Sequence, residues 1–183
     1  MGRRPVGPGA CLYLADETKS RGFHFALVRI ATNDVAEQRQ AMLALRRPGQ
    51  RSTHFASEGD RARRQALSAV CEAPVSAVIL RAPTGLRDLA SREACVRELA
   101  RRACADQAVS IVLDRDDSTL AHDRRWLFEE LRRSTLTQQL SYVHRHRHEE
   151  PLLVMPDAVA WCWQRGGEWR RRVKNIIAEV HDL

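Results

Sequence analysis

The sequence predicts an α/β protein with a mixed sheet that opens with an antiparallel hairpin and carries helices on both faces. Three observations lead to this class. Two short apolar segments near the N-terminus are separated by a polar turn, which favours a hairpin. Later apolar segments alternate with stretches of helical periodicity, as in α/β folds. Two predicted strands, residues 12–15 and 109–113, run directly into aspartates.

The composition is that of an ordinary globular domain. The chain has 183 residues, 44% hydrophobic and 29% charged, which is enough to bury a core without disulfides. We expect residues 1–10 to form a flexible N-terminus and residues 11–183 to form a single domain. The five cysteines show no C-x-x-C spacing, which favours reduced thiols and a cytoplasmic location. No apolar run reaches the roughly 18 residues that a membrane helix needs, so neither a signal sequence nor membrane contact is expected.

The net charge of +7 comes almost wholly from arginine, since Lys19 and Lys174 are the only lysines. Arginine binds phosphate in a bidentate manner, so the basic balance fits a polyanionic partner such as nucleic acid. An arginine-rich solvated face fits the same numbers. The charge alone leaves both readings open, and the oligomeric state is not indicated.

The order of elements follows from periodicity and from Pro, Gly and acidic breakers. A second strand is predicted over residues 23–30, with Phe23, Phe25 and Leu27 on one face. The later predicted elements are a helix from Asn33 and Asp34 to Pro48, an extended piece at 52–55, a helix from Ser57 onward, a strand at 75–80, a helix at 87–104 with Leu89 in its inner stripe and arginines outside, a strand at 109–113, a helix at 119–133, a strand at 140–147, a buried helix beginning near Pro156, and a last helix at 169–180.

Carboxylates follow the first and fourth predicted strands: Asp16 and Glu17 after one, Asp114 after the other. If these strands are parallel neighbours, Asp16 and Asp114 emerge at the same edge of the sheet. A structural alternative is that Asp16 and Glu17 only open a turn. Asp157, near the start of the late apolar helix, has its own alternative, since the helix dipole favours an acid there.

Histidines provide two further candidates. His54 lies before a predicted helix start, where it is either a functional group or a hydrogen-bonded structural residue. His144, His146 and His148 alternate along the predicted strand 140–147. Such a row can hold a transition metal, and it also fits a polar edge strand protected by charge.

The predicted layout is that of a ribonuclease H-like domain. It has a hairpin first, then helix-linked strands, with acids at Asp16, Asp114 and Asp157. The segments YLADET, STHFASEGDRARR, VSIVLDRDD and EEPLLVMPDAVAWCW resemble the successive motifs of the domain of unknown function 3800 family, whose members are assigned a ribonuclease H-like fold. The resemblance spans roughly Cys11 to Val173. The positions that match the family's motifs are Asp16, Glu17, His54, Asp114 and Asp157. Two small residues of the family's first motif are replaced here by a threonine and a lysine.

The resemblance implies a metal-dependent phosphodiester nuclease. A physical argument points the same way, because carboxylates gathered at one sheet edge repel one another and a hard divalent cation relieves the repulsion. Mg²⁺ or Mn²⁺ is therefore the expected cofactor, with arginines holding the nucleic-acid backbone. In this hypothesis Asp16, Asp114 and Asp157 bind the metal, Glu17 is an outer-shell or auxiliary ligand, and His54 transfers a proton.

Two alternatives of different classes remain. The Asp114 to Ser118 segment resembles the Asp-x-Asp signature of haloacid dehalogenase-type phosphatases, although that fold normally opens with the motif. A basic nucleic-acid or protein-binding module could keep the fold without the chemistry. No GxGxxG or Walker-type loop is present in the sequence, which argues against a Rossmann or kinase fold.

Overall fold

A computed structural model describes residues 10–19, 22–133 and 140–183. The predicted flexible terminus, 1–10, lies outside these residues except for Ala10. The elements are β1 (Cys11–Thr18), β2 (His24–Ala31), η1 (Thr32–Asp34), α1 (Val35–Leu43), η2 (Phe55–Ser57), α2 (Asp60–Glu72), β3 (Val75–Arg81), α3 (Asp88–Ala105), β4 (Ser110–Asp114), α4 (Leu120–Arg133), β5 (Ser141–Arg145), η3 (Pro151–Leu153), α5 (Val154–Arg165), α6 (Gly167–Val173) and β6 (Ile177–Asp182).

The strands form one six-stranded mixed sheet in the order β5-β4-β1-β2-β3-β6. The predicted antiparallel hairpin is confirmed, since β1 pairs with β2 in antiparallel register, and β2 pairs with β3 in the same way. The condition for Asp16 and Asp114 to share an edge is met, since β4 runs parallel to β1. Strand β5 in turn runs parallel to β4. The carboxyl ends of β1 and β4 therefore meet at one edge of the sheet.

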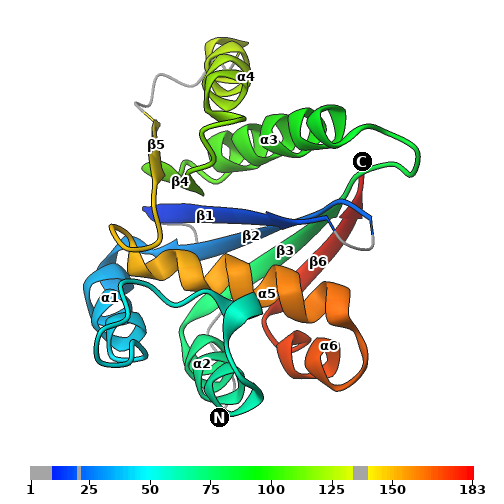
Figure 1. Ribbon diagram of the computed structural model, residues 1–183. Helices are drawn as coiled ribbons and strands as arrows, with labels where there is room; N and C mark the ends of the chain where they lie inside the picture. The colour runs from blue at the N-terminus through cyan, green and yellow to red at the C-terminus, as the bar shows by residue number, and fades with distance from the viewer. Residues whose placement is uncertain (1–9, 20–21, 134–139) are drawn as a thin grey trace.

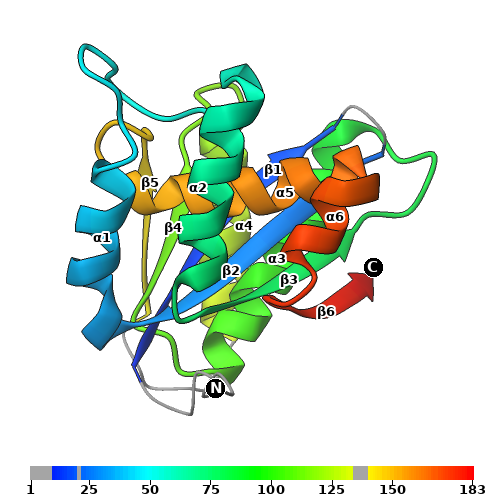
Figure 2. The ribbon, with the colours of Figure 1, turned by 90° about the horizontal axis from the view of Figure 1, so that it is seen from below.

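Helices cover both faces of the sheet, as the sequence predicts. Figure 1 shows α3 and α4 on one side and α1, α2, α5 and α6 on the other, and Figure 2 shows the second group from below. Alternating residues of the central strands supply the two cores. Leu14 and Val28 belong to the core under α5, while Phe25 and Leu27 belong to the core under α3 and α4. The two-residue repeat of a strand makes this division.

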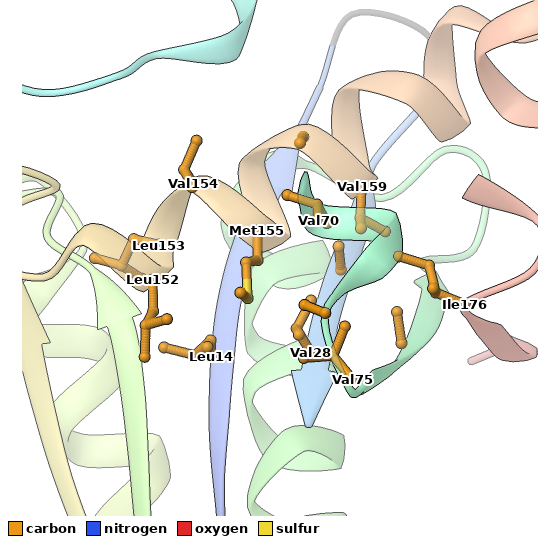
Figure 3. Close-up of a cluster of buried hydrophobic side chains, with 14 of the residues drawn as sticks. Leu14, Val28, Val70, Val75, Leu152, Leu153, Val154, Met155, Val159 and Ile176 are labelled. Atoms are coloured by element: carbon orange, nitrogen blue, oxygen red, sulfur yellow. The ribbon is translucent and has the colours of Figure 1, made fainter. Parts of the chain in front are cut away.

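Helix α5 is the most deeply buried helix, and it positions part of the site described below. Met155 and Val159 pack on the sheet face that presents Leu14 and Val28, as the close-up in Figure 3 shows. The sequence predicts a start near Pro156, whereas the helix begins at Val154 after η3. Pro156 is compatible with this earlier start because the first turn of a helix does not need its N–H.

The C-terminal prediction was wrong. Residues 169–180 do not form one helix, because α6 ends at Val173 and β6 begins at Ile177. Strand β6 runs parallel to β3 at the edge of the sheet. Most of its residues are exposed, so it lacks the alternation of apolar and polar residues that marks a half-buried strand.

Smaller predictions also failed. The expected extended piece at 52–55 is irregular chain followed by η2, and the strand expected at 140–147 ends at Arg145. Leu89, predicted to lie in the inner stripe of α3, is exposed, whereas Arg92 on the same helix is buried. Arg92 is buried because it forms an ion pair with the fully buried Asp123.

Candidate functional site

Three of the predicted acids come from three different elements and lie at one edge of the sheet. Asp16 lies near the carboxyl end of β1, and Asp114 is the last residue of the parallel neighbour β4. Asp157 lies in the first turn of α5, which packs across β1. Asp16 and Asp157 are buried, and Asp114 is partly exposed. The fold thus gathers residues that are distant in sequence.

Arg147 joins these three acids. Its Nη2 lies 2.8 Å from Asp16 Oδ2 and 2.7 Å from Asp114 Oδ2, and its Nη1 lies 3.5 Å from Asp157 Oδ2. We call Asp16, Asp114 and Asp157 the carboxylate cluster. Sequence reasoning did not single out Arg147, which lies at the end of the predicted strand 140–147 and looks like the many other arginines of the chain. Register brings the end of β5 to Asp114, because Arg145 is the pairing partner of that aspartate.

His54 reaches the cluster through Asp157. Its Nδ1 lies 3.1 Å from Asp157 Oδ2, and the backbone N–H of Phe55 donates to the same oxygen at 2.8 Å. The side chain of His54 is 48% exposed, so the ring borders both the cluster and solvent. Asp157 therefore has a structural task as well, since it anchors η2 to α5.

Glu17 does not join the cluster. It neighbours Asp16 within β1, and successive residues of a strand point to opposite faces. Its carboxylate instead pairs with Arg92 and, at 3.2 Å, with Lys19. The prediction that Asp16 and Glu17 merely open a turn is wrong in detail, because both lie inside the strand.

A second charged cluster lies on the opposite face of the sheet. Arg92 donates to both oxygens of Asp123 at 2.8 Å, and His144 Nε2 lies 3.1 Å from Asp123 Oδ2. The side chains are 2%, 0% and 2% exposed for Arg92, Asp123 and His144, respectively. We call Arg92, Asp123, His144 and Glu17 the buried ion network. It joins α3, α4, β5 and β1.

The histidine row does not form a metal site. His144 points into the buried ion network, while the rings of His146 and His148 stack on each other with centroids 5.3 Å apart. The strand ends at Arg145, so the alternation that the sequence suggested stops before the second histidine.

The Asp114 to Ser118 segment, which resembles a phosphatase motif, forms hydrogen bonds and an ion pair within itself. Asp116 Oδ1 accepts hydrogen bonds from the backbone N–H and the hydroxyl of Ser118, and Asp117 pairs with Arg115 at 2.7 Å. Asp116 therefore stabilises the turn that leads into α4. Asp114 is the acid of this segment that belongs to the carboxylate cluster.

Burial and like charge raise the pKa values of Asp16 and Asp114. Burial is the largest cause of the raised pKa of Asp16, and Asp157, Glu17 and Asp114 add to it, while Arg147 opposes it. The pKa of Asp114 is raised as well, again chiefly by burial and again opposed by Arg147. One guanidinium thus leaves the cluster with uncompensated negative charge.

Replacing Asp16 with asparagine should therefore stabilise the protein at neutral pH. Because the pKa is raised in the folded state, the stability that protonated Asp16 contributes is present below its ordinary value of 3.8 and is lost as the pH rises through the folded value. We expect Asp16→Asn to gain about 1 kcal/mol at pH 7, or roughly 2–4 °C in Tm. Its stability should also depend less on pH above 3.8 than that of the wild type. Thermal unfolding from pH 4 to 8 measures both, with the exposed Asp117→Asn as the unchanged control; a destabilised Asp16→Asn variant would contradict the argument.

The donor chemistry of the cluster suits a hard cation, since every donor is a carboxylate oxygen. The present arrangement is nevertheless that of a guanidinium site. Within residues 10–19, 22–133 and 140–183, no three or more His, Cys, Asp or Glu side chains are grouped closely enough to hold a metal ion. A divalent cation would thus be bound by Asp16, Asp114 and Asp157 only after the guanidinium leaves.

Fold and site together define a mixed α/β protein with an acidic cluster at the carboxyl edge of its central parallel strands. No protein-family model matches the chain, and no curated protein is significantly similar to it. The resemblance to the domain of unknown function 3800 family therefore stays a prediction. In the described part of the chain, no helix is both long and apolar enough to cross a membrane.

Proposed function

We propose that the protein has a ribonuclease H-like fold and is a metal-dependent nuclease that hydrolyses phosphodiester bonds of nucleic acid. The sheet supports the fold assignment: an antiparallel β1-β2-β3 unit comes first, and β4 and β5 then add in parallel on the other side of β1. The resemblance to the domain of unknown function 3800 family implies a mixed sheet that opens with an antiparallel hairpin, and the observed sheet is of this kind.

The observation that carries the activity is the convergence of Asp16, Asp114 and Asp157 on a single guanidinium. Three elements supply these oxygens, so the fold itself creates a cation-binding position. A third carboxylate beside one guanidinium adds repulsion unless more positive charge is present. The excess of carboxylate is the property that a divalent cation satisfies.

In the proposed reaction, Asp16, Asp114 and Asp157 hold Mg²⁺ or Mn²⁺. The cation supplies Lewis-acid activation of water and of the scissile phosphate. In this proposal His54 moves a proton; the contact of its ring with Asp157 and its 48% exposed side chain support that role. Arg115 directly follows Asp114 and is 41% exposed, so it is a candidate for binding the phosphate backbone.

The test compares wild type, Asp16→Asn and the surface variant Asp182→Asn on a panel of single-stranded and duplex RNA and DNA and an RNA–DNA hybrid. We expect wild type and Asp182→Asn to cleave at least one substrate in Mg²⁺ or Mn²⁺, and EDTA to stop cleavage. Asp16→Asn should lose activity by at least about 100-fold, the size of losing one charge-stabilising group. Because this variant is expected to be more stable than the wild type, unfolding would not explain the loss. Cleavage that survives EDTA, or that is undiminished in Asp16→Asn, would remove the proposal.

A second candidate is a basic nucleic-acid-binding module without catalytic chemistry. The observation that favours it is Arg147 itself, which already contacts every acid of the cluster and so substitutes for a metal. Divalent-metal titration separates the two candidates. A metal-binding cluster should raise the Tm as the metal concentration rises, whereas an inert module should show no such response.

A further inference from the structure

Arg147 and Arg92 are held very differently, although both are arginines surrounded by acids. All three guanidinium nitrogens of Arg92 have carboxylate partners in Asp123 and Glu17, and its side chain is 2% exposed. The side chain of Arg147 is 18% exposed. Its buried Nε has no hydrogen-bond partner among the residues that the structure describes. Arg92 is thus fully satisfied, whereas Arg147 is not.

A second buried polar group without a hydrogen-bond partner in the described chain lies beside Arg147. This group is the hydroxyl of Thr53, and Thr53 lines the same small hollow as Arg147. A buried polar atom without a partner costs free energy. The guanidinium therefore occupies a position that does not fulfil its bonding capacity, which is unusual for a permanent structural ion pair.

His54 lies where Arg147 meets Asp157. Its Nδ1 faces both Arg147 Nη1 and Asp157 Oδ2. The ring is 48% exposed, so this end of the guanidinium borders solvent through the imidazole.

The main chain of Arg147 is held independently of its side chain. Arg46 donates to the Arg147 carbonyl oxygen at 3.1 Å, and the turn is closed by the backbone N–H of Glu149, which donates to the His146 carbonyl at 2.9 Å. These bonds do not involve the guanidinium. The side chain can therefore leave the carboxylate cluster by rotation about its own bonds while the loop stays in place.

We propose that Arg147 is a displaceable internal cation that competes with the divalent metal for Asp16, Asp114 and Asp157. It fills the cluster when no metal is bound and sets the metal concentration at which the site loads. This inference rests on the proposed function, since it assigns the regulation of the same site. Its physical basis is a population effect. A group that stabilises the metal-free arrangement reduces the fraction of molecules whose site is accessible to the metal, and the apparent metal affinity falls in proportion to that fraction.

The test measures Mn²⁺ binding directly by titration calorimetry and by the electron paramagnetic resonance signal of free Mn²⁺, without nucleic acid. The variants are Arg147→Gln, which removes the charge, and Arg147→Lys, which keeps a charge but loses the planar fork that spans several carboxylates. We expect Arg147→Gln to bind Mn²⁺ about 10-fold more tightly than wild type, with Arg147→Lys between them. Arg145→Gln, two residues earlier and exposed, is the matched control and should bind like wild type. Adding Asp16→Asn to Arg147→Gln should abolish the gain.

The outcomes distinguish this inference from the proposed function. Equal or weaker Mn²⁺ binding by Arg147→Gln, with clear binding by wild type, overturns the competition while leaving the metal site intact. No binding by wild type or either Arg147 variant overturns both, and Arg147 is then a fixed counter-ion. If Arg147→Gln does not fold, Arg147→Lys decides: binding no tighter than wild type overturns the competition.

Discussion

Replacing Asp123 with alanine should lower the free energy of unfolding by about 3–5 kcal/mol, the usual cost of removing one partner from a buried ion pair. Asp123 is fully buried, and it accepts two hydrogen bonds from Arg92, which is itself 2% exposed. Without it, the Arg92 guanidinium keeps only Glu17, and His144 loses its acceptor. Urea unfolding followed by circular dichroism measures the loss.

Asp182→Ala is the matched control for this prediction, because Asp182 also pairs with an arginine, Arg81, but at the surface. Exposed pairs contribute at most about 1 kcal/mol. Similar losses of unfolding free energy in the two variants would mean that the buried ion network stabilises the fold no more than a surface ion pair does. A loss below about 1 kcal/mol in Asp123→Ala would have the same meaning.

The pH dependence gives a second check on Asp123. Burial raises its pKa, but the hydrogen bonds from Arg92 and His144 outweigh burial, so the net shift is below the ordinary value of 3.8. A group with a lowered folded pKa contributes stability above its unfolded pKa and loses it as the pH falls through the folded one. The difference between wild type and Asp123→Ala should therefore shrink below pH 3.8. The raised pKa of Asp16 changes stability in the opposite direction and at pH values above 3.8. The two effects therefore occur in different pH ranges.

The sequence predicted the fold where local pattern and burial agree. The hairpin, β3 and β4 are short apolar runs bounded by turn residues, and most of α3 has a regular inner stripe. Strand β6 has neither signal, since it lies at the sheet edge and its side chains are mostly exposed. Pairing with β3, about 100 residues earlier, makes it a strand. A tertiary contact of this kind leaves no trace in a local window.

Asp16 and Asp114 were predictable for a topological reason, because parallel neighbouring strands end at the same edge of a sheet. Asp157 lies on a helix and was singled out through the family resemblance. The arginines were not predictable. Arg92 and Arg147 look like the many solvent-facing arginines around them, and their burial depends on partners that other elements supply. The pairing of Glu17 with Arg92 was not predictable either, because adjacent acids in a strand point to opposite faces, which a motif of two neighbouring letters hides.

These placements give the two faces of the sheet different tasks. On one face the buried ion network ties together β1, β5, α3 and α4 with satisfied charges. On the other face the carboxylate cluster holds charges that Arg147 compensates only in part. The carboxyl end of β1 contributes to both through Glu17 and Asp16. The sheet therefore carries a fully paired charge network on one face and an incompletely compensated acidic cluster on the other.

Substitution of Leu14 tests how far the carboxylate cluster depends on the core beneath α5. This residue is fully buried in β1, on the sheet face that α5 covers, and Figure 3 shows it near Met155 and Leu152. Leu14→Ala should cost about 2–5 kcal/mol, because it removes buried methyl groups and leaves a cavity in a strand that is paired on both sides. At roughly 2–4 °C per kcal/mol for a chain of this size, the Tm should fall by several degrees.

Leu14→Met is the matched control, since it conserves volume and should cost less than about 1.5 kcal/mol. Helix α5 carries Asp157, so a cavity beneath it also loosens the acid that fixes η2 and contacts His54. Hydrogen exchange at the Phe55 amide, which donates to Asp157, should accelerate in Leu14→Ala more than in Leu14→Met. Unchanged exchange in a clearly destabilised Leu14→Ala variant would separate the core from the site and show that Asp157 is positioned by η2 rather than by the packing of α5 on β1.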